Sequence, residues 1–288
     1  MNESATRPSV VVGIDGSKAA IQAALWAIDE AVSRDIPLRL LYAIEPDGAQ
    51  RTLPDRAARK LAIAENAVRY AFTAVEAADR PVKIEVEIAQ ERPITALIRA
   101  SASAALLCVG AVGAYHFRAA RVGSTAAALA VAGRCPVAII RDQGHRDRRH
   151  PRWIVVDIHG SGENSLLLGI AAEEALLRNA PLKAITCRET RGGETDDKGA
   201  PGDCERWIRA NSDRQLARWI RCYPEIQVES VAVHRSLLDY LADNSRSVQL
   251  VVVGARNHAH LEQLVGPMGT AVLNNSDCSV LIVDRQNL

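Results

Sequence analysis

The 288-residue chain lacks several features that mark particular classes of protein. Aromatic residues make up only 4%, and 35 basic residues against 34 acidic ones leave a net charge of +1. A protein that neutralises nucleic-acid phosphates normally carries a basic excess, so nucleic acid is not an expected partner. No apolar run reaches the roughly 20 residues of a membrane span, and residues 1–9 lack the apolar core of a signal peptide. We therefore expect a cytoplasmic protein.

Common metal, redox and phosphate motifs are also missing. No two of the six cysteines lie at a CxxC or CxxxC spacing, which excludes a zinc knuckle and a thioredoxin-type pair. The chain has no Gly-Lys-Ser/Thr, and the first helix does not open with Gly-x-Gly-x-x-Gly. The P-loop and the dinucleotide fingerprint are therefore excluded.

The chain repeats itself at an offset of 143 to 144 residues. Three pairs of segments match in order: Val10–Ser17 with Ile154–Ser161, Leu106–Ala111 with Leu250–Ala255, and Arg134–Ile140 with Asp277–Val283. Such a register indicates a duplicated domain. We predict domains over residues 1–143 and 153–288, joined by a polar linker over residues 144–152.

Each repeat alternates short apolar runs with longer helix-period stretches, which predicts an α/β fold with a parallel sheet and helices on both faces. In the first repeat we expect five strands, at 9–14, 38–44, 82–89, 106–109 and 137–140. We expect helices at 19–34, 57–78, 94–103 and 124–133, with a loop over 45–56. Ligands bind such sheets beyond the carboxyl ends of the strands. The residues around Ile14, Ala43 and Val109 are therefore the place to look for chemistry.

Glycines cluster after the fourth expected strand. The segment from Gly110 to Thr125 has the pattern Gly-x2-Gly-x9-Gly-Ser-Thr. Glycines let backbone N–H groups approach an anion without interference from a Cβ atom. Gly123, Ser124 and Thr125 open the next helix, where free N–H groups and two hydroxyls converge. This pattern predicts a phosphate site.

The strand Val10–Ser17, the glycine segment and the closing Cys-Pro-Val strand together resemble the universal stress protein family, in its tandem-domain form of the actinobacterial and mycobacterial type. The resemblance implies two five-stranded parallel α/β sandwiches, similar to the adenine nucleotide alpha hydrolases, and binding of ATP with Mg²⁺ held largely by phosphates. By motif position, Asp15 would contact the adenosine, and Ile14, Ala43 and Val109 would line the base and ribose. The phosphates would lie against Gly110, Gly113, Gly123, Ser124 and Thr125.

Simpler structural roles remain open for these residues. Asp15 and Ser17 are both common helix caps, as are Ser124 and Thr125, and the glycines can serve a tight turn alone. Within the loop only Phe117 and Arg118 match the family's usual residues, and Val112 stands where arginine is frequent.

The second repeat departs from the motif. His159 stands at the position of Asp15, Asn257 replaces the second glycine, and Pro267 follows Gly266 where the first repeat has Ser124. The expected loop from Asn257 to Gly266 is one residue shorter. We predict that this copy binds ATP poorly and acts as a structural partner. His159, His258 and His260 raise the hypothesis of a metal site, but we expect exposed loop histidines.

The resemblance implies an ATP-binding stress or dormancy regulator, and the departures in the second repeat leave one competent site, in the N-terminal domain. We expect no enzymatic activity, because no catalytic lysine, aspartate or base stands in a recognisable motif. A slow ATPase and a nucleotide-free dimerisation scaffold stay open as alternatives. The expected partners are an adenine nucleotide, an unknown regulatory protein and a second copy of the chain. The resemblance also implies that strands 137–140 and 280–283 pair within the chain as a pseudo-dimer.

Overall fold

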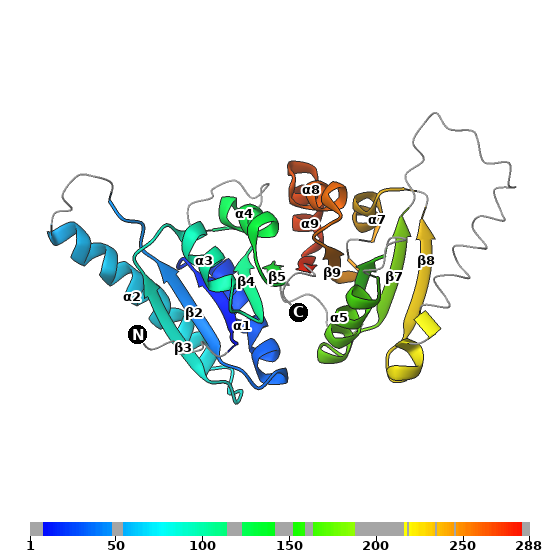
Figure 1. Ribbon diagram of the computed structural model, residues 1–288, viewed down its shortest axis with the longest axis horizontal. Helices are drawn as coiled ribbons and strands as arrows, with labels where there is room; N and C mark the ends of the chain where they lie inside the picture. The colour runs from blue at the N-terminus through cyan, green and yellow to red at the C-terminus, as the bar shows by residue number, and fades with distance from the viewer. Residues whose placement is uncertain are drawn as a thin grey trace, which may run out of the picture. The chain divides into compact units, whose positions relative to one another are not determined.

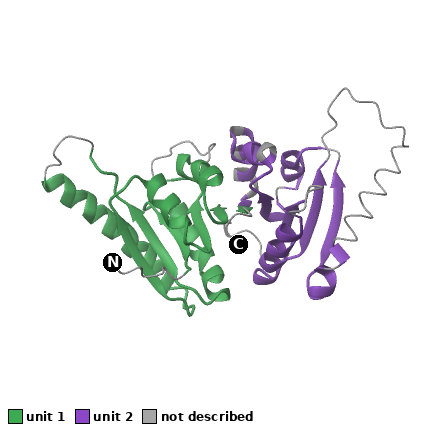
Figure 2. Ribbon diagram, viewed as in Figure 1, with its two compact units in different colours: residues 1–142, 281–288 green, residues 143–280 purple. Residues whose placement is uncertain are grey.

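The computed structural model describes residues 8–47, 54–113, 123–141, 152–158, 164–187, 216–217, 219–233, 235–244 and 246–283. The chain divides into two compact units (Figure 2). Unit 1 comprises residues 1–142 with 281–288, and unit 2 comprises residues 143–280. No helix among the described residues is long and apolar enough to cross a membrane.

Unit 1 alternates strands with helices, as the sequence predicts (Figure 1). The strands are β1 (Val10–Ile14), β2 (Leu38–Ala43), β3 (Ile84–Ala89), β4 (Leu106–Gly110) and β5 (Val137–Ile140). The helices are α1 (Lys18–Ser33), α2 (Pro54–Glu76), α3 (Pro93–Ser101) and α4 (Ser124–Ala132). The expected elements are confirmed within three residues at each end.

The sheet of unit 1 has the strand order β3-β2-β1-β4-β5, and its neighbouring strands pair in parallel. Its central strands are covered on both faces, which is why their sequences are continuously apolar: β1 has four buried residues out of five. Helix α1 packs against α2, and α3 packs against α4. The strand order reverses between β1 and β4, which is where α/β sheets bind ligands.

Unit 2 repeats this plan. Four of its strands follow the order β9-β6-β7-β8: β6 (Trp153–Asp157), β7 (Leu182–Cys187), β8 (Val228–Val233) and β9 (Val248–Gly254). Strand β10 (Ser279–Val283) follows β9 in the strand order, and its last three residues belong to unit 1. Its helices are α5 (Asn164–Leu177), α7 (Leu237–Asp243), α8 (His258–Val265) and α9 (Pro267–Ser276). The α/β fold class with two tandem parallel-sheet domains is thereby confirmed. The predicted domain boundaries and the predicted pairing of the two closing strands stay predictions.

A buried ion pair recurs in both units at the offset of the repeat. Glu30 on α1 is fully buried and accepts from Arg34 one turn later. Glu174 on α5 is 2% exposed and pairs with Arg178 in the same way. The duplication has therefore kept a polar contact inside the first helix of each copy.

Candidate functional site

A tight turn joins β1 to α1 in unit 1. Gly16 has a φ of +82°, in the left-handed region that favours glycine. Ser17 caps α1, because its side-chain oxygen accepts from the backbone N–H of Ala20 at 3.1 Å. The N–H of Ser17 donates to Oδ1 of Asp15 at 2.9 Å. Ser17 is thus the helix cap, and the turn fixes the carboxylate of Asp15 beyond the end of β1.

The glycines after β4 form the facing wall. A Cβ atom on Gly110 would lie 2.7 Å from the carbonyl carbon of Ala19, so this glycine permits close packing of β4 on α1. A Cβ atom on Gly113 would lie 2.9 Å from Oδ2 of Asp15. The second glycine of the motif therefore faces the carboxylate at the end of β1.

Helix α4 begins at this wall. The N–H of Gly123 donates to the carbonyl of Ala111 at 2.8 Å, which ties the helix start to the first glycine turn. Gly123 is the N-cap residue and makes no side-chain cap hydrogen bond. Ser124 and Thr125 therefore occupy the first turn and are not caps. An uncapped N-terminus presents backbone N–H groups that suit an anion.

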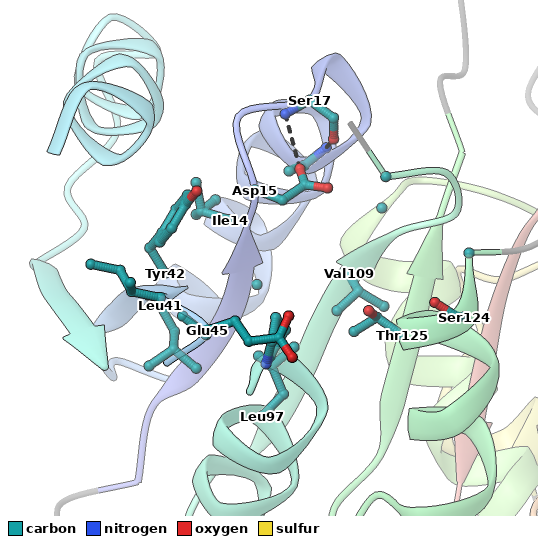
Figure 3. Close-up of a pocket in the computed structure, with 18 of the residues that line it drawn as sticks. Ile14, Asp15, Ser17, Leu41, Tyr42, Glu45, Leu97, Val109, Ser124 and Thr125 are labelled. Carbon is teal, nitrogen blue, oxygen red and sulfur yellow. Dashed lines mark hydrogen bonds between the residues drawn. The ribbon is translucent and has the colours of Figure 1, made fainter. Parts of the chain in front are cut away.

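One cavity of about 750 Å³ lies between these walls, within the size range of small-molecule sites. In Figure 3, Asp15 and Ser17 lie at the tip of β1, Leu41, Tyr42 and Glu45 come from the β2 side, and Val109, Ser124 and Thr125 come from β4 and α4. The cavity is lined by all nine residues selected from the sequence: Ile14, Asp15, Ala43, Val109, Gly110, Gly113, Gly123, Ser124 and Thr125. The motif residues, which are up to 111 positions apart, thus meet at one place.

The structure adds a wall that the sequence analysis missed. Helix α2 begins at Pro54, three residues before its expected start, and contributes Arg56, Lys60 and Ile63 to the cavity lining. The ammonium of Lys60 donates to Oδ1 of Asp47 at 2.6 Å and to the carbonyl of Glu45 at 2.8 Å. The spacing of 56, 60 and 63 places these side chains on one face of a helix, a signal that was available in the sequence.

Some predicted residues lie outside the part that the structure describes. Phe117 and Arg118 of the glycine loop belong to this group, as does His159 of the second repeat. Among the described residues, no group of three or more His, Cys, Asp or Glu side chains is arranged to hold a metal ion.

Unit 2 has polar side chains where unit 1 has the cavity. Register along β6 and β1 places Asp157 at the position of Gly13, which lines the cavity in unit 1. Asp157 is 1% exposed, and its Oδ2 lies 2.6 Å from Nδ1 of His260. Asn257, which replaces Gly113, donates to the same oxygen at 3.3 Å. Side chains from both replaced glycine positions therefore contact each other in unit 2.

Two expectations about unit 2 were wrong. Residues 258–265 were expected in a loop but form helix α8, because Asn257 caps it and Leu261 and Leu264 are buried beneath it. His260 was expected to be exposed but is 6% exposed and pairs with Asp157. One signal was available in the repeat alignment, which places Asp157 at the position of Gly13. A carboxylate inside an apolar strand needs a polar partner, and His260 is that partner.

Comparison with known proteins agrees with this architecture. The model of the universal stress protein family matches residues 7–141 and again 152–284. Universal stress protein Rv2028c of Mycobacterium tuberculosis is 59% identical over 288 residues, covering 100% of both chains. Universal stress protein Rv3134c of the same species is 41% identical over 282 residues, covering 97% of each.

Solved structures share the fold across both repeats. A universal stress protein from Archaeoglobus fulgidus superposes with a TM-score of 0.69 at 15% identity, and the match covers 96% of each chain. At this low identity the superposition shows only that the fold is shared. Membership of the family is shown by the sequence identities over the full length of the chain. The chain belongs to the universal stress protein family and carries two of its domains in tandem.

Proposed function

We propose that the protein binds ATP in the cavity of unit 1 and acts as a nucleotide-dependent regulator in stress or dormancy. The observation that carries the proposal is the convergence of Asp15, the two glycine turns and the N-terminus of α4 on one cavity. Its floor is apolar, because Ile14 and Val109 are nearly fully buried there. A nucleotide needs both features, an apolar surface for the base and N–H groups for the phosphates.

The orientation of the nucleotide follows from the two ends of the cavity. Phosphates fit beside Gly113 and the start of α4, where backbone donors are available and no Cβ intervenes. The base fits toward β2, between Ile14, Leu41 and Leu97. Mg²⁺ is proposed only as a companion of the phosphates, since such ions commonly keep most ligands from substrate and water.

Unit 2 is proposed to bind no nucleotide. Its Asp157, Asn257 and His260 bring a carboxylate and two polar side chains to the position of the cavity floor. A buried carboxylate there would repel phosphate, and moving it would break the contact with His260. The expected stoichiometry is therefore one nucleotide per chain.

The regulatory role draws on the relatives, which are named universal stress proteins. Binding would change the conformation around the glycine turns, and a partner would respond to that change. We propose binding rather than evolved catalysis, which a phosphate-release assay would check. Assembly into a homodimer is also proposed, and sedimentation velocity would measure it.

The test is calorimetric titration of the full chain with ATP, AMP and cyclic AMP, with and without Mg²⁺. We expect ATP to bind at one site per chain. Gly113→Asn should abolish that binding, because it places the residue of unit 2 against Asp15. The matched control is Asn257→Gly, which alters the equivalent position of unit 2 and should leave the affinity unchanged.

Three outcomes would contradict parts of the proposal. Absence of binding at millimolar ATP would favour the nucleotide-free scaffold. Two sites per chain would refute the account of unit 2. Tight binding of AMP or cyclic AMP with weak binding of ATP would keep the cavity as a nucleotide site but change its ligand.

A further inference from the structure

Lys60 lines the cavity from helix α2, which contains none of the sequence motifs. It stands in the N-terminal half of α2, and its side chain is 30% exposed. Its ammonium donates to Oδ1 of Asp47 at 2.6 Å and to the carbonyl of Glu45 at 2.8 Å. Both acceptors belong to the segment that follows β2. Lys60 is therefore fixed at the cavity by two contacts from one short stretch of chain.

These contacts leave one donor for a ligand. A lysine ammonium carries three N–H groups and no acceptor, and two of them are used by Asp47 and Glu45. Because Lys60 lines the cavity, its third N–H can donate a hydrogen bond to a ligand bound there. A donor held in place before binding loses less entropy when the ligand arrives.

The charge at this end of the cavity favours an acceptor atom over a donor. Lys60 and Arg56 supply two positive charges, and Asp47 pairs with both, at 2.6 and 3.3 Å. The Glu45 carboxylate lies 3.5 Å from Nε of Arg92. The net excess of one positive charge from Lys60, Arg56 and Asp47 suits a ring nitrogen or a carbonyl oxygen.

The surroundings of Lys60 suit a flat ring. Ile63 lies one turn further along α2, lines the cavity and is 51% exposed, which is high for an isoleucine. Leu41 on β2 and Leu97 on α3 line the same cavity and are almost fully buried. A base inserted here would cover the exposed face of Ile63. Its edge would then point toward the ammonium of Lys60.

The sheet topology separates this end from the phosphate end. Helix α2 packs on β2 and β3, on one side of β1, whereas α4 packs on β5, on the other side. A nucleotide whose phosphates lie at α4 therefore directs its base toward α2.

We propose that Lys60 is a base-reading residue, whose ammonium donates a hydrogen bond to a ring nitrogen of adenine, and that Asp47 positions it. This inference rests on the proposed function, since it takes the ligand to be an adenine nucleotide. It adds a contact from α2 to the motif residues of β1, β4 and α4.

The experiment measures the affinity of the full chain for ATP and for its 1-deaza, 3-deaza and 7-deaza analogues, each of which replaces one ring nitrogen by C–H. Lys60→Met keeps the length of the side chain and removes the ammonium. We expect it to weaken ATP binding by roughly 10- to 100-fold, the range for a hydrogen bond from a charged group. Arg59→Met is the control, because Arg59 is an exposed cation of α2 that does not line the cavity.

The analogues separate a base contact from a general effect of charge. One analogue should bind the wild-type protein less tightly than ATP does, by about the factor that Lys60→Met causes for ATP. The same analogue should bind the Lys60→Met variant as tightly as it binds the wild-type protein. Unchanged ATP binding by Lys60→Met would overturn the inference. An equal loss for ATP and all three analogues would also overturn it, because Lys60 would then act through charge or structure. Failure of wild type to bind any adenine nucleotide would instead refute the proposed function.

Discussion

Gly110, which ends β4, and Gly113, three residues later, should respond differently to substitution by alanine: the first should lose stability and the second ATP affinity. A Cβ atom on Gly110 would lie 2.7 Å from the carbonyl carbon and 2.8 Å from Cβ of Ala19. The carbonyl carbon is part of the backbone of α1, and the Cβ atom is fixed to that backbone, so neither atom can move aside by a side-chain rotation. Among the described residues, a Cβ atom on Gly113 would approach only Oδ2 of Asp15, at 2.9 Å, which is the end of a side chain.

The magnitudes follow from this difference. Overpacking of a well-packed contact costs about 1 to 3 kcal/mol of the free energy of unfolding, so Gly110→Ala should be destabilised by that amount. In a domain of this size 1 kcal/mol corresponds to about 4 °C in Tm, which gives a fall of roughly 4 to 12 °C. Gly113→Ala should change stability by less than about 0.5 kcal/mol. It should nevertheless weaken ATP binding, because the methyl group enters the space between Asp15 and the glycine turn.

Two measurements on the same preparations test the pair. Thermal unfolding followed by circular dichroism gives Tm, and calorimetric titration with ATP gives the affinity. Gly110→Ala with a wild-type Tm would show that β4 and α1 are not packed this closely. Gly113→Ala with wild-type stability and wild-type ATP affinity would remove the second glycine from the binding site.

Three further predictions concern other parts of the chain. Gly16→Ala should cost about 1 kcal/mol in urea unfolding, because φ at this position is +82°, and a wild-type midpoint would contradict the turn geometry. His260→Ala should cost about 3 kcal/mol, because it removes the partner of a carboxylate that is 1% exposed, whereas Glu262→Ala on the exposed face of α8 should change little. Burial raises the pKa of the Cys135 thiol to about 12, so the folded state holds its proton more firmly than the unfolded state. That contribution to stability is complete below about pH 9 and is lost toward pH 12, by about 1.4 kcal/mol per pH unit, and the difference between wild type and Cys135→Ala in urea unfolding should show this slope.

Much of unit 1 could be predicted because local patterns and tertiary structure agree there. Strand β1 is an unbroken apolar run and proves to be covered on both faces. Helix α1 shows Ile21 and Ile28 in its apolar stripe, and both are buried. The residues of the glycine motif, at the end of β4 and the start of α4, all line the cavity.

The errors arise where a contact joins distant segments. Nothing near His260 in the sequence indicates burial, since its partner Asp157 lies 103 residues earlier. Helix α8 was missed because the segment was compared with the glycine loop of unit 1, although it contains neither glycine nor proline between its caps. The role of Lys60 at the cavity depends on Asp47 and on where α2 begins, and a helical pattern alone fixes neither.

The two repeats together separate glycines that serve the fold from glycines that serve the cavity. Gly110 has its counterpart in Gly254, which ends β9, so both copies keep a residue without Cβ at this position. Gly13 and Gly113 are replaced by Asp157 and Asn257, yet β6 pairs with β7 in the register that β1 has with β2. Side chains at these two positions are therefore compatible with the fold. In unit 1 both glycines line the cavity, where a Cβ atom on Gly13 would lie 3.2 Å from Cγ1 of Val109 and one on Gly113 would lie 2.9 Å from Oδ2 of Asp15. A role in backbone packing alone accounts for Gly110, which lies against α1, but not for Gly113, where a Cβ atom would meet the carboxylate of Asp15.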